Sequence, residues 1–407
     1  MKYSIVNLGC KVNRVESDDY ESLLTSRGYA YTESQDADIV VINTCTVTGE
    51  AEKKTRKAVR QALKRFPYAS VIVTGCASAI NPEFFTALDD RIEVVAKPDM
   101  QDYLARTIAS LEARHVGVSA PSNRARMGVK VQDGCDNACT YCIVHVARGR
   151  ASSRPVNEII PDVLRLVESG VFEIVLSGIN IGSYNYEGIK LAELLRILME
   201  ATSSYKTEFA PFVRFRVSSI EPMDVDDDFV ALLASSEGRV CRHLHLPLQS
   251  GSSKVLREMA RPYDAEDFKR LVDYLRAEVP DISLTTDIIV GFPGETDEDF
   301  ADTLSAAEYC GFSKIHVFPY SKREGTPAAE RADQVNPEVK AARAKALRDL
   351  SDQLRSIDYE GRVSGKEYVL VEQPGVGMSE SYHEIAVDVA LPAGSLVEVS
   401  IPDEQKK

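Results

Sequence analysis

The stretch VKVQDGCDNACTYC, residues 129–142, decides the fold. A strand-like run, Val129–Gln132, leads directly into three cysteines with the spacing Cys135-x3-Cys139-x2-Cys142. Three thiolates suit a cubane iron–sulfur cluster, and three ligands for four irons leave one iron open to bind a small molecule. The alternative is a zinc site with three cysteines and one histidine, because His145 follows the last cysteine by three residues.

Strand-like runs and helices alternate on both sides of this stretch. The predicted strands are Val129–Gln132, Glu173–Ser177, Val213–Ser218, His243–Pro247, Leu284–Val290 and Lys314–Pro319. Helices are predicted at Val156–Ser169, Asp264–Glu278 and Asp297–Cys310. Six such units predict an open, partial (β/α)6 barrel. The cysteine motif would then lie at the C-terminal mouth of the barrel, where such folds place their chemistry.

Other candidate cofactor-binding residues follow the later strands at the same edge. Tyr141 either lies against a bound ligand or is an ordinary loop aromatic. Gly178 either lets the backbone approach that ligand or forms a plain turn, and Glu221 either accepts hydrogen bonds from it or begins the next helix. The remaining candidates are Ser177, Arg216, Ser218, Gln249, Asp287 and Gly291. Each is a weak signal alone, and the location they share makes them a predicted site.

Residues 1–100 predict a separate parallel α/β domain. Its strands are Ser4–Leu8, Ile39–Asn43 and Val71–Thr74, and its helices are Glu16–Arg27 and Glu50–Phe66. A cysteine follows each strand almost at once: Cys10, Cys45 and Cys76. Loops after parallel strands share one edge of a sheet, and neighbouring strands lie only ~4.8 Å apart. We therefore expect these three thiols to converge on one ligand; the alternative is that small cysteines simply pack well there.

The end of the chain changes character again. A polar helix, Pro337–Tyr359, precedes three short strands that predict a small β-barrel, at Tyr368–Glu372, Glu384–Val389 and Leu396–Ile401. A linker rich in Ser, Pro and Arg occupies Ala120–Arg126. The predicted domains are therefore residues 1–118, 127–358 and 359–407.

Composition and charge limit the possible functions. The net charge of −14 argues against binding nucleic acid by bulk charge, so any RNA contact needs a local basic patch. The sequence has no apolar run near ~18 residues and no secretory signal, so we expect a cytoplasmic protein without disulfides. Cys241 and Cys310 lack metal-like spacing and are predicted core residues.

A basic patch is predicted on the helix after Cys45. Seven of the thirteen residues from Lys53 to Arg65 are Lys or Arg, and none is acidic. Lys53, Lys57, Arg60 and Lys64 share a face at helical spacing, and Arg148 is a further predicted RNA contact. The alternative is an ordinary solvated helix face. Residues 360–407 instead hold nine acidic and four basic residues, so we expect the helix, rather than the terminal barrel, to contact phosphate.

These motifs together resemble the radical S-adenosylmethionine methylthiotransferases over essentially the whole chain. The segments LGCKVN (8–13), NTCTVT (43–48) and TGC (74–76) are similar to the three cysteine motifs of that family's N-terminal domain. The segments GCDNACTYC (134–142) and ARG (147–149) are similar to its radical core, and the terminal segment is similar to its small TRAM-like β domain. His145 stands where the family usually has proline, so the resemblance does not extend to that part of the loop.

The resemblance implies two 4Fe–4S clusters, S-adenosylmethionine as cofactor and tRNA as substrate. Cys135, Cys139 and Cys142 would hold the radical-generating cluster, while Cys10, Cys45 and Cys76 would hold an auxiliary cluster that carries the sulfur. The first two cysteine motifs are most similar to the branch acting on N6-threonylcarbamoyladenosine beside the anticodon. A flavodoxin or ferredoxin would supply electrons, and we expect a monomer. The alternatives are another modified tRNA adenosine, a ribosomal-protein side chain, or a zinc-stabilised RNA-binding protein without catalysis.

Overall fold

The computed structural model describes residues 1–46, 49–111 and 125–403, which divide into two compact units. The first contains the described part of residues 1–123 together with residues 134–136 and Cys142–Arg150. The second contains the remaining described residues. Most of the predicted linker, residues 120–124, lies outside the described residues. No helix in the described ranges is long and apolar enough to cross a membrane.

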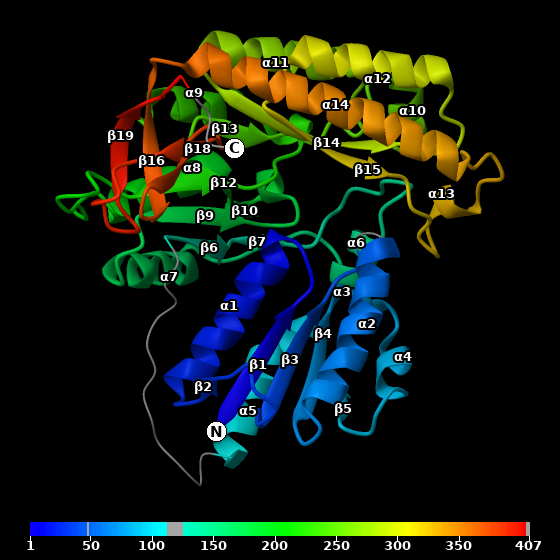
Figure 1. Ribbon diagram of the computed structural model, residues 1–407, viewed down its shortest axis with the longest axis vertical. Helices are drawn as coiled ribbons and strands as arrows, with labels where there is room; N and C mark the ends of the chain where they lie inside the picture. Colours follow the sequence, from blue (N-terminus) through cyan, green and yellow to red (C-terminus); the bar gives the residue numbers. More distant parts are fainter. Residues whose placement is uncertain (47–48, 112–124, 404–407) are drawn as a thin grey trace. The chain divides into compact units, whose positions relative to one another are not determined.

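The first unit is built on a parallel sheet, as the sequence predicts, but the sheet has five strands rather than the three predicted (Figure 1). Its strand order is β2-β1-β3-β4-β5, with β1 at Lys2–Asn7, β2 at Ala30–Tyr31, β3 at Ile39–Thr44, β4 at Ser70–Gly75 and β5 at Ile92–Val94. The helices are α1 (Lys11–Ser26), α2 (Gly49–Arg65), α3 (Cys76–Ile80), α4 (Pro82–Thr86), α5 (Met100–Leu111) and α6 (Val144–Arg148), with a 3-10 turn at Lys97–Asp99. Residues of α1 and α5 pack on one side of the sheet and those of α2 on the other, so both faces are buried.

The second unit contains the predicted partial barrel. Its parallel strands are β6 (Arg126–Lys130), β9 (Glu173–Ser177), β12 (Arg214–Val217), β13 (His243–His245), β14 (Ser283–Val290) and β15 (Lys314–Pro319), in the order β6-β9-β12-β13-β14-β15. Single bridges from Phe215 to Val240 and from Ser219 to His245 join the two halves of the sheet. The first strand begins earlier than predicted, and Gln132–Asp133 turns away as β7 to pair with β8 (Ser152–Ser153).

Helices cover one face of this sheet. They are α7 (Val156–Glu168), α8 (Leu191–Ala201), α9 (Asp227–Ser235), α10 (Ser253–Glu258), α11 (Ala265–Glu278), α12 (Asp297–Cys310), α13 (Pro327–Glu330) and α14 (Pro337–Arg362). Figure 1 shows α11, α12 and α14 side by side over β14 and β15. Ile174, Phe215, Leu244 and Ile288 belong to the core under these helices. Because side chains alternate along a strand, the residues between them face the opposite, concave side.

The concave side is polar and is closed at one end by the last part of the chain. Glu173 on β9 forms buried ion pairs with Arg214 and Arg216 on β12. Arg216 also donates hydrogen bonds to the carbonyl oxygens of Ser379 and Glu380, at 3.2 and 2.8 Å. These carbonyls belong to the antiparallel C-terminal sheet, whose strands are β16 (Lys366–Gln373), β17 (Val376–Ser379), β18 (Glu384–Ala386) and β19 (Leu396–Ser400). The small terminal β domain therefore packs with the barrel in one unit.

Candidate functional site

Three cysteine-bearing loops of the first unit are joined by side-chain hydrogen bonds. Asn13, three residues after Cys10, donates from Nδ2 to Asn43 Oδ1 at 3.0 Å and to the Thr44 carbonyl at 2.9 Å. Thr44, directly before Cys45, donates from Oγ1 to the carbonyl of Thr74 at 2.6 Å. The three predicted ligand loops therefore lie at one edge of the parallel sheet and hold one another in place.

Glycine makes the third of these loops possible. Gly75 precedes Cys76 with φ at +105°, and a Cβ there would lie 2.3 Å from the carbonyl oxygen of Thr44. Any other residue would be strained and would push the β3 and β4 loops apart. Cys76 itself begins the short helix α3, whereas the sequence predicts only a loop cysteine. On the β3 side, Thr55 of α2 donates to the Cys45 carbonyl at 3.0 Å, which fixes the second cysteine against the helix.

A buried cation lies against the third cysteine. The guanidinium of Arg148 approaches Cys76 Sγ with Nε at 3.3 Å, and it also binds Glu16 Oε1 at 3.0 Å and Asn13 Oδ1 at 2.8 Å. Lys97 pairs with the same Glu16 carboxylate. The Arg148 side chain is only 1% exposed, and its contact with RNA stays a prediction. Two cations around one carboxylate leave net positive charge beside the cysteines, which suits an anionic group.

The second unit places an arginine against the middle cysteine of the CxxxCxxC motif in the same manner. Arg261 donates from Nη1 to Cys139 Sγ at 3.1 Å and forms an ion pair with Glu221. Tyr263 supports this arginine, since its hydroxyl accepts from Arg261 Nε at 3.1 Å and donates to the Pro247 carbonyl at 2.7 Å. Burial raises the pKa of Glu221, while the guanidinium of Arg261 acts in the opposite sense.

Two predicted cofactor residues at the strand ends carry buried hydroxyls with no hydrogen-bond partner among the described residues. These are Ser177 at the end of β9 and Ser218 just after β12. An orphaned buried hydroxyl costs roughly 1–3 kcal/mol, so such groups at a strand-end site point to a missing ligand. Tyr141 is partly buried against a small apolar cluster that includes Phe292 and Tyr320. The site therefore offers both polar and apolar surface.

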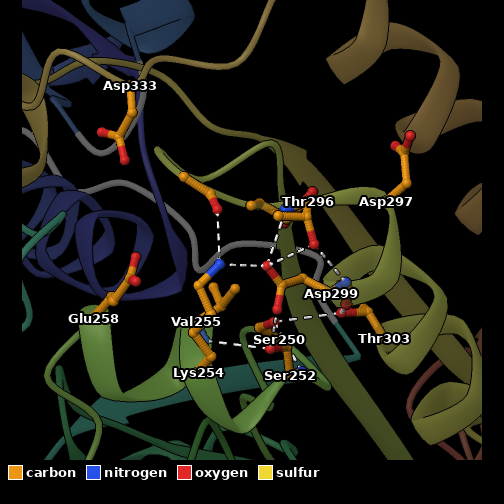
Figure 2. A network of polar contacts seen from close by, with 12 residues as sticks. Ser250, Ser252, Lys254, Val255, Glu258, Thr296, Asp297, Asp299, Thr303 and Asp333 are labelled. Atoms are coloured by element: carbon orange, nitrogen blue, oxygen red, sulfur yellow. Dashed lines mark hydrogen bonds and ion pairs between the residues drawn. The ribbon is translucent and has the colours of Figure 1, made fainter.

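The loop after β13, which carries the predicted residue Gln249, is held by the first turn of α12 (Figure 2). Asp299 accepts from Ser252 Oγ and from Lys254 Nζ, both at 2.7 Å, and from the backbone amide of Thr296 at 2.9 Å. Burial alone would raise the pKa of Asp299, but these hydrogen bonds outweigh it and lower the pKa to about 2. Gln249 adopts φ of +67° and joins the sheet through the Asp287 carbonyl at 2.8 Å.

Three predicted cofactor residues have structural reasons for their identity. Arg216 is fully buried in an ion pair with Glu173, which accounts for its identity, and its contact with a cofactor stays a prediction. A Cβ at Gly178 would lie 2.9 Å from Gln132 Oε1, and one at Gly291 would lie 2.4 Å from Lys340 Cγ. Close packing therefore explains both glycines without a ligand. Cys241 and Cys310 are buried, which confirms that they are core residues.

The basic helix presents its predicted face outward. Lys53, Lys57, Arg60 and Lys64 are exposed on α2, while Thr55, Val59 and Ala62 are buried on the opposite side. The arrangement is compatible with phosphate contact, and the contact itself stays a prediction.

The zinc alternative predicted from the sequence has Cys135, Cys139, Cys142 and His145 as its ligands, and it stays an alternative. Ligand atoms around a tetrahedral zinc lie close together, because each is roughly 2.0–2.3 Å from the metal. Within the described ranges, the group of three or more such atoms that all lie within 4.8 Å of one another is His245, Asp287 and His316. Cys135, Cys142 and His145, which belong to one unit, form no such group.

Sequence reasoning missed several residues of these sites. Arg261 contacts Cys139, while Glu16 and Lys97 act one step away: Glu16 pairs with Arg148, and Lys97 pairs with Glu16. Nothing in the spacing of the cysteines marks these residues. His245 and His316 come together only through strand register, because Asp287 and His316 are direct neighbours across β14 and β15.

Comparison with known proteins agrees with this architecture. Residues 129–307 match the Radical SAM superfamily, and residues 2–96 match the uncharacterized protein family UPF0004. Among solved structures, the radical S-adenosylmethionine methyltransferase TsrM of Kitasatospora setae is similar in fold, with a TM-score of 0.58 at 17% identity. The match covers 81% of this chain and 75% of that one.

Curated relatives are more similar in sequence. The chain is 38% identical to the threonylcarbamoyladenosine tRNA methylthiotransferase MtaB of Thermotoga maritima, over 89% of this chain and 84% of the relative. It is 39% identical to the Bacillus subtilis protein of the same name, over 85% and 79%. It is also 34% identical to a tRNA-2-methylthio-N(6)-dimethylallyladenosine synthase of Endomicrobium trichonymphae, over 92% and 89%.

A radical S-adenosylmethionine enzyme is therefore the class that the barrel and its cysteine motif define. The chain belongs to the tRNA methylthiotransferase family of that superfamily.

Proposed function

We propose that this enzyme methylthiolates C2 of N6-threonylcarbamoyladenosine in tRNA and that it holds two 4Fe–4S clusters. The observation that carries the proposal is the pair of cysteine triads, each accompanied by a buried arginine at one thiol. The threonylcarbamoyladenosine relatives, at 36–39% identity, supply the choice of base.

The residues present fit both clusters. Cys10, Cys45 and Cys76 would hold one cluster, with Arg148 offsetting its negative charge. Cys135, Cys139 and Cys142 would hold the other, with Arg261 donating to the Cys139 sulfur. The unpartnered hydroxyls of Ser177 and Ser218 would bind polar groups of S-adenosylmethionine. When bound, these cofactors supply a carbon-centred radical, which the unactivated C2–H bond of adenine requires, and the sulfur that replaces the hydrogen.

The proposed reaction defines what the protein's own groups must do. The two buried arginines each donate a hydrogen bond to one cysteine sulfur and so hold that side chain in place. The loop from Gln249 to Lys254 must stay rigid at the strand ends, and Asp299 holds it there. The base must be positioned on the polar concave side of the barrel.

Nucleoside analysis tests the proposal. In tRNA from cells lacking this gene, 2-methylthio-N6-threonylcarbamoyladenosine should be absent and its unthiolated precursor should accumulate. Restoring the gene should reverse both changes. If instead the 2-methylthio derivative of dimethylallyladenosine were lost, the assignment of the base would be wrong.

Cysteine variants test whether one triad serves cleavage of S-adenosylmethionine and the other serves insertion of sulfur. Cys135→Ala should abolish cleavage of S-adenosylmethionine. Cys45→Ala should retain reductant-dependent cleavage but form no methylthiolated nucleoside. Iron and sulfide content should fall by about half in each triad knockout, since each set of ligands holds its own cluster. Full product formation by Cys45→Ala would contradict the auxiliary-cluster role.

A further inference from the structure

The concave side of the barrel carries a polar cluster of two histidines and Asp287, which is one of the predicted cofactor-binding residues. His245 on β13, Asp287 on β14 and His316 on β15 bring one ligand atom each to within 4.8 Å of the others. The register of the three strands brings these residues together. Asp287 is paired with His316, and His245 is paired with Thr285, two residues before Asp287. Leu244, Leu284 and Ile288 alternate with them and pack under the helices, so the cluster lies on the uncovered side.

A hydrogen-bond chain fixes the orientation of the cluster. Thr285 Oγ1 lies 3.1 Å from His243 Nε2 and 3.0 Å from His245 Nδ1, and His245 Nε2 lies 3.3 Å from Asp287 Oδ1. One assignment consistent with these distances has His243 donating to Thr285, Thr285 donating to His245 Nδ1, and His245 Nε2 directed at the Asp287 carboxylate. Asp287 is thereby held as an acceptor, with its second oxygen available to a ligand.

The cluster adjoins the cofactor edge and opens outward. The segment that carries Glu221 lies beside β13, since the backbone amide of Ile220 donates to the His245 carbonyl at 3.1 Å. Glu221 in turn pairs with Arg261, which donates to the sulfur of Cys139. Exposure rises along the cluster, from 14% for the His245 side chain to 30% for Asp287, and His316 is exposed. A substrate group that reaches this side of the barrel would therefore meet Asp287 and His316 first.

We propose that Asp287 and His316, oriented by His245, bind the polar N6 substituent of the target adenosine and so select threonylcarbamoyl over an alkyl group. This inference rests on the proposed function. A threonylcarbamoyl group carries urea N–H groups, a hydroxyl and a carboxylate, which match one carboxylate acceptor and an imidazole donor. A dimethylallyl group offers no hydrogen bond to replace those that water makes with Asp287 and His316, so its binding there would cost desolvation without compensation. Sites built to hydrogen-bond a substrate group strongly reject analogues that lack it.

Binding of two synthetic anticodon stem-loops tests the proposal. One carries threonylcarbamoyladenosine and the other carries unmodified adenosine at the same position; both are titrated anaerobically into reconstituted enzyme without reductant. The wild type should prefer the modified RNA. His316→Leu should reduce that preference by about tenfold or more, the effect of one lost hydrogen bond to a charged group. His316→Gln, which keeps a donor, should retain part of it, and neither variant should weaken binding of the unmodified RNA.

The outcomes separate the two levels of the proposal. If the wild type shows no preference and does not methylthiolate the modified stem-loop, the proposed function fails. If the wild type shows both but His316→Leu keeps the full preference, only the role of the cluster fails. An equivalent of divalent metal bound by the wild type and lost in His316→Leu, with unchanged RNA preference, would make the cluster a metal site and overturn the inference.

Discussion

An arginine donates to one cysteine of each triad: Arg148 to Cys76 and Arg261 to Cys139. Both guanidiniums are also paired with a glutamate, Glu16 and Glu221. A buried guanidinium lowers the cost of adding an electron to a nearby group and holds the thiolate in one rotamer. Neither arginine could be assigned this role from sequence, because each contact joins residues more than 70 positions apart.

Replacing Arg148 should change the redox properties of the auxiliary cluster. In a background with Cys135, Cys139 and Cys142 changed to Ala, only that cluster would remain. Arg148→Gln removes one buried positive charge, so the reduction potential should become more negative. A redox titration followed by electron paramagnetic resonance measures it. Arg150→Gln is the matched control, since that side chain is 90% exposed and should leave the potential unchanged; equal shifts in both variants would contradict the role of Arg148.

At the scale of elements, helix α12 shows how one helix start organises a loop of the site. Thr296 and Asp299 form a reciprocal capping box. Asp299 also accepts hydrogen bonds from Ser252 and Lys254, at the start of helix α10. The single carboxylate therefore satisfies the helix N-terminus and fixes the loop after β13.

Asp299→Asn should lower stability in a pH-dependent manner. At pH 7 we expect a loss of about 1–3 kcal/mol, because charge-assisted hydrogen bonds disappear. The pKa of Asp299 is lowered to about 2, so its stabilisation is complete above the ordinary value near 4 and is lost as pH falls through about 2. The difference in thermal midpoint between wild type and variant should therefore narrow between pH 7 and pH 3. Glu298→Gln, an exposed change in the same helical turn, should have little effect at either pH.

The elements differ in how well sequence predicts them. Buried runs such as Ile39–Thr44 and Ser70–Gly75 were predictable because uninterrupted β-branched residues are typical of parallel strands. Helix α1 begins at Lys11, five residues before its predicted start, because Asn13 and Glu16 are polar yet buried against the cysteine loops. When polar residues are buried at a site, the spacing of apolar residues no longer marks the buried face of the helix. The His245–Asp287–His316 cluster was unpredictable for a different reason, because the register between neighbouring strands cannot be derived from the residues of each strand alone.

At the scale of the whole molecule, charge is distributed unevenly over an acidic chain. If Lys53, Lys57 and Arg60 of α2 each contact a phosphate, changing all three to Gln should flatten the slope of log affinity against log salt by roughly two units. The modified base should not change, because phosphate contacts position without specifying. Binding of tRNA across a salt series provides the measurement.

Two controls accompany the salt series. Arg165, Lys345 and Arg348 changed together to Gln remove the same charge from exposed helix positions of the second unit and should leave the slope unchanged. Lys366→Gln removes an exposed lysine of the terminal sheet. If this change flattened the slope while the α2 variant did not, the terminal sheet would be the RNA platform. Deleting residues beyond Gly361 is not a usable control, because Arg214 and Arg216 would lose their carbonyl partners.

The contacts of these two arginines also determine which part of the barrel can pack last during translation. Arg216 leaves the ribosome well before Ser379 and Glu380, which lie 163 and 164 positions later in the chain. Until those carbonyls and the Tyr382 ring arrive, two guanidiniums at the barrel floor share one carboxylate, Glu173, and remain open to water. We therefore expect the polar side of the barrel to complete its packing only after the C-terminal sheet has been synthesised. A chain released before that point would expose these buried arginines to water, and we expect proteases to cleave it more readily than the complete chain.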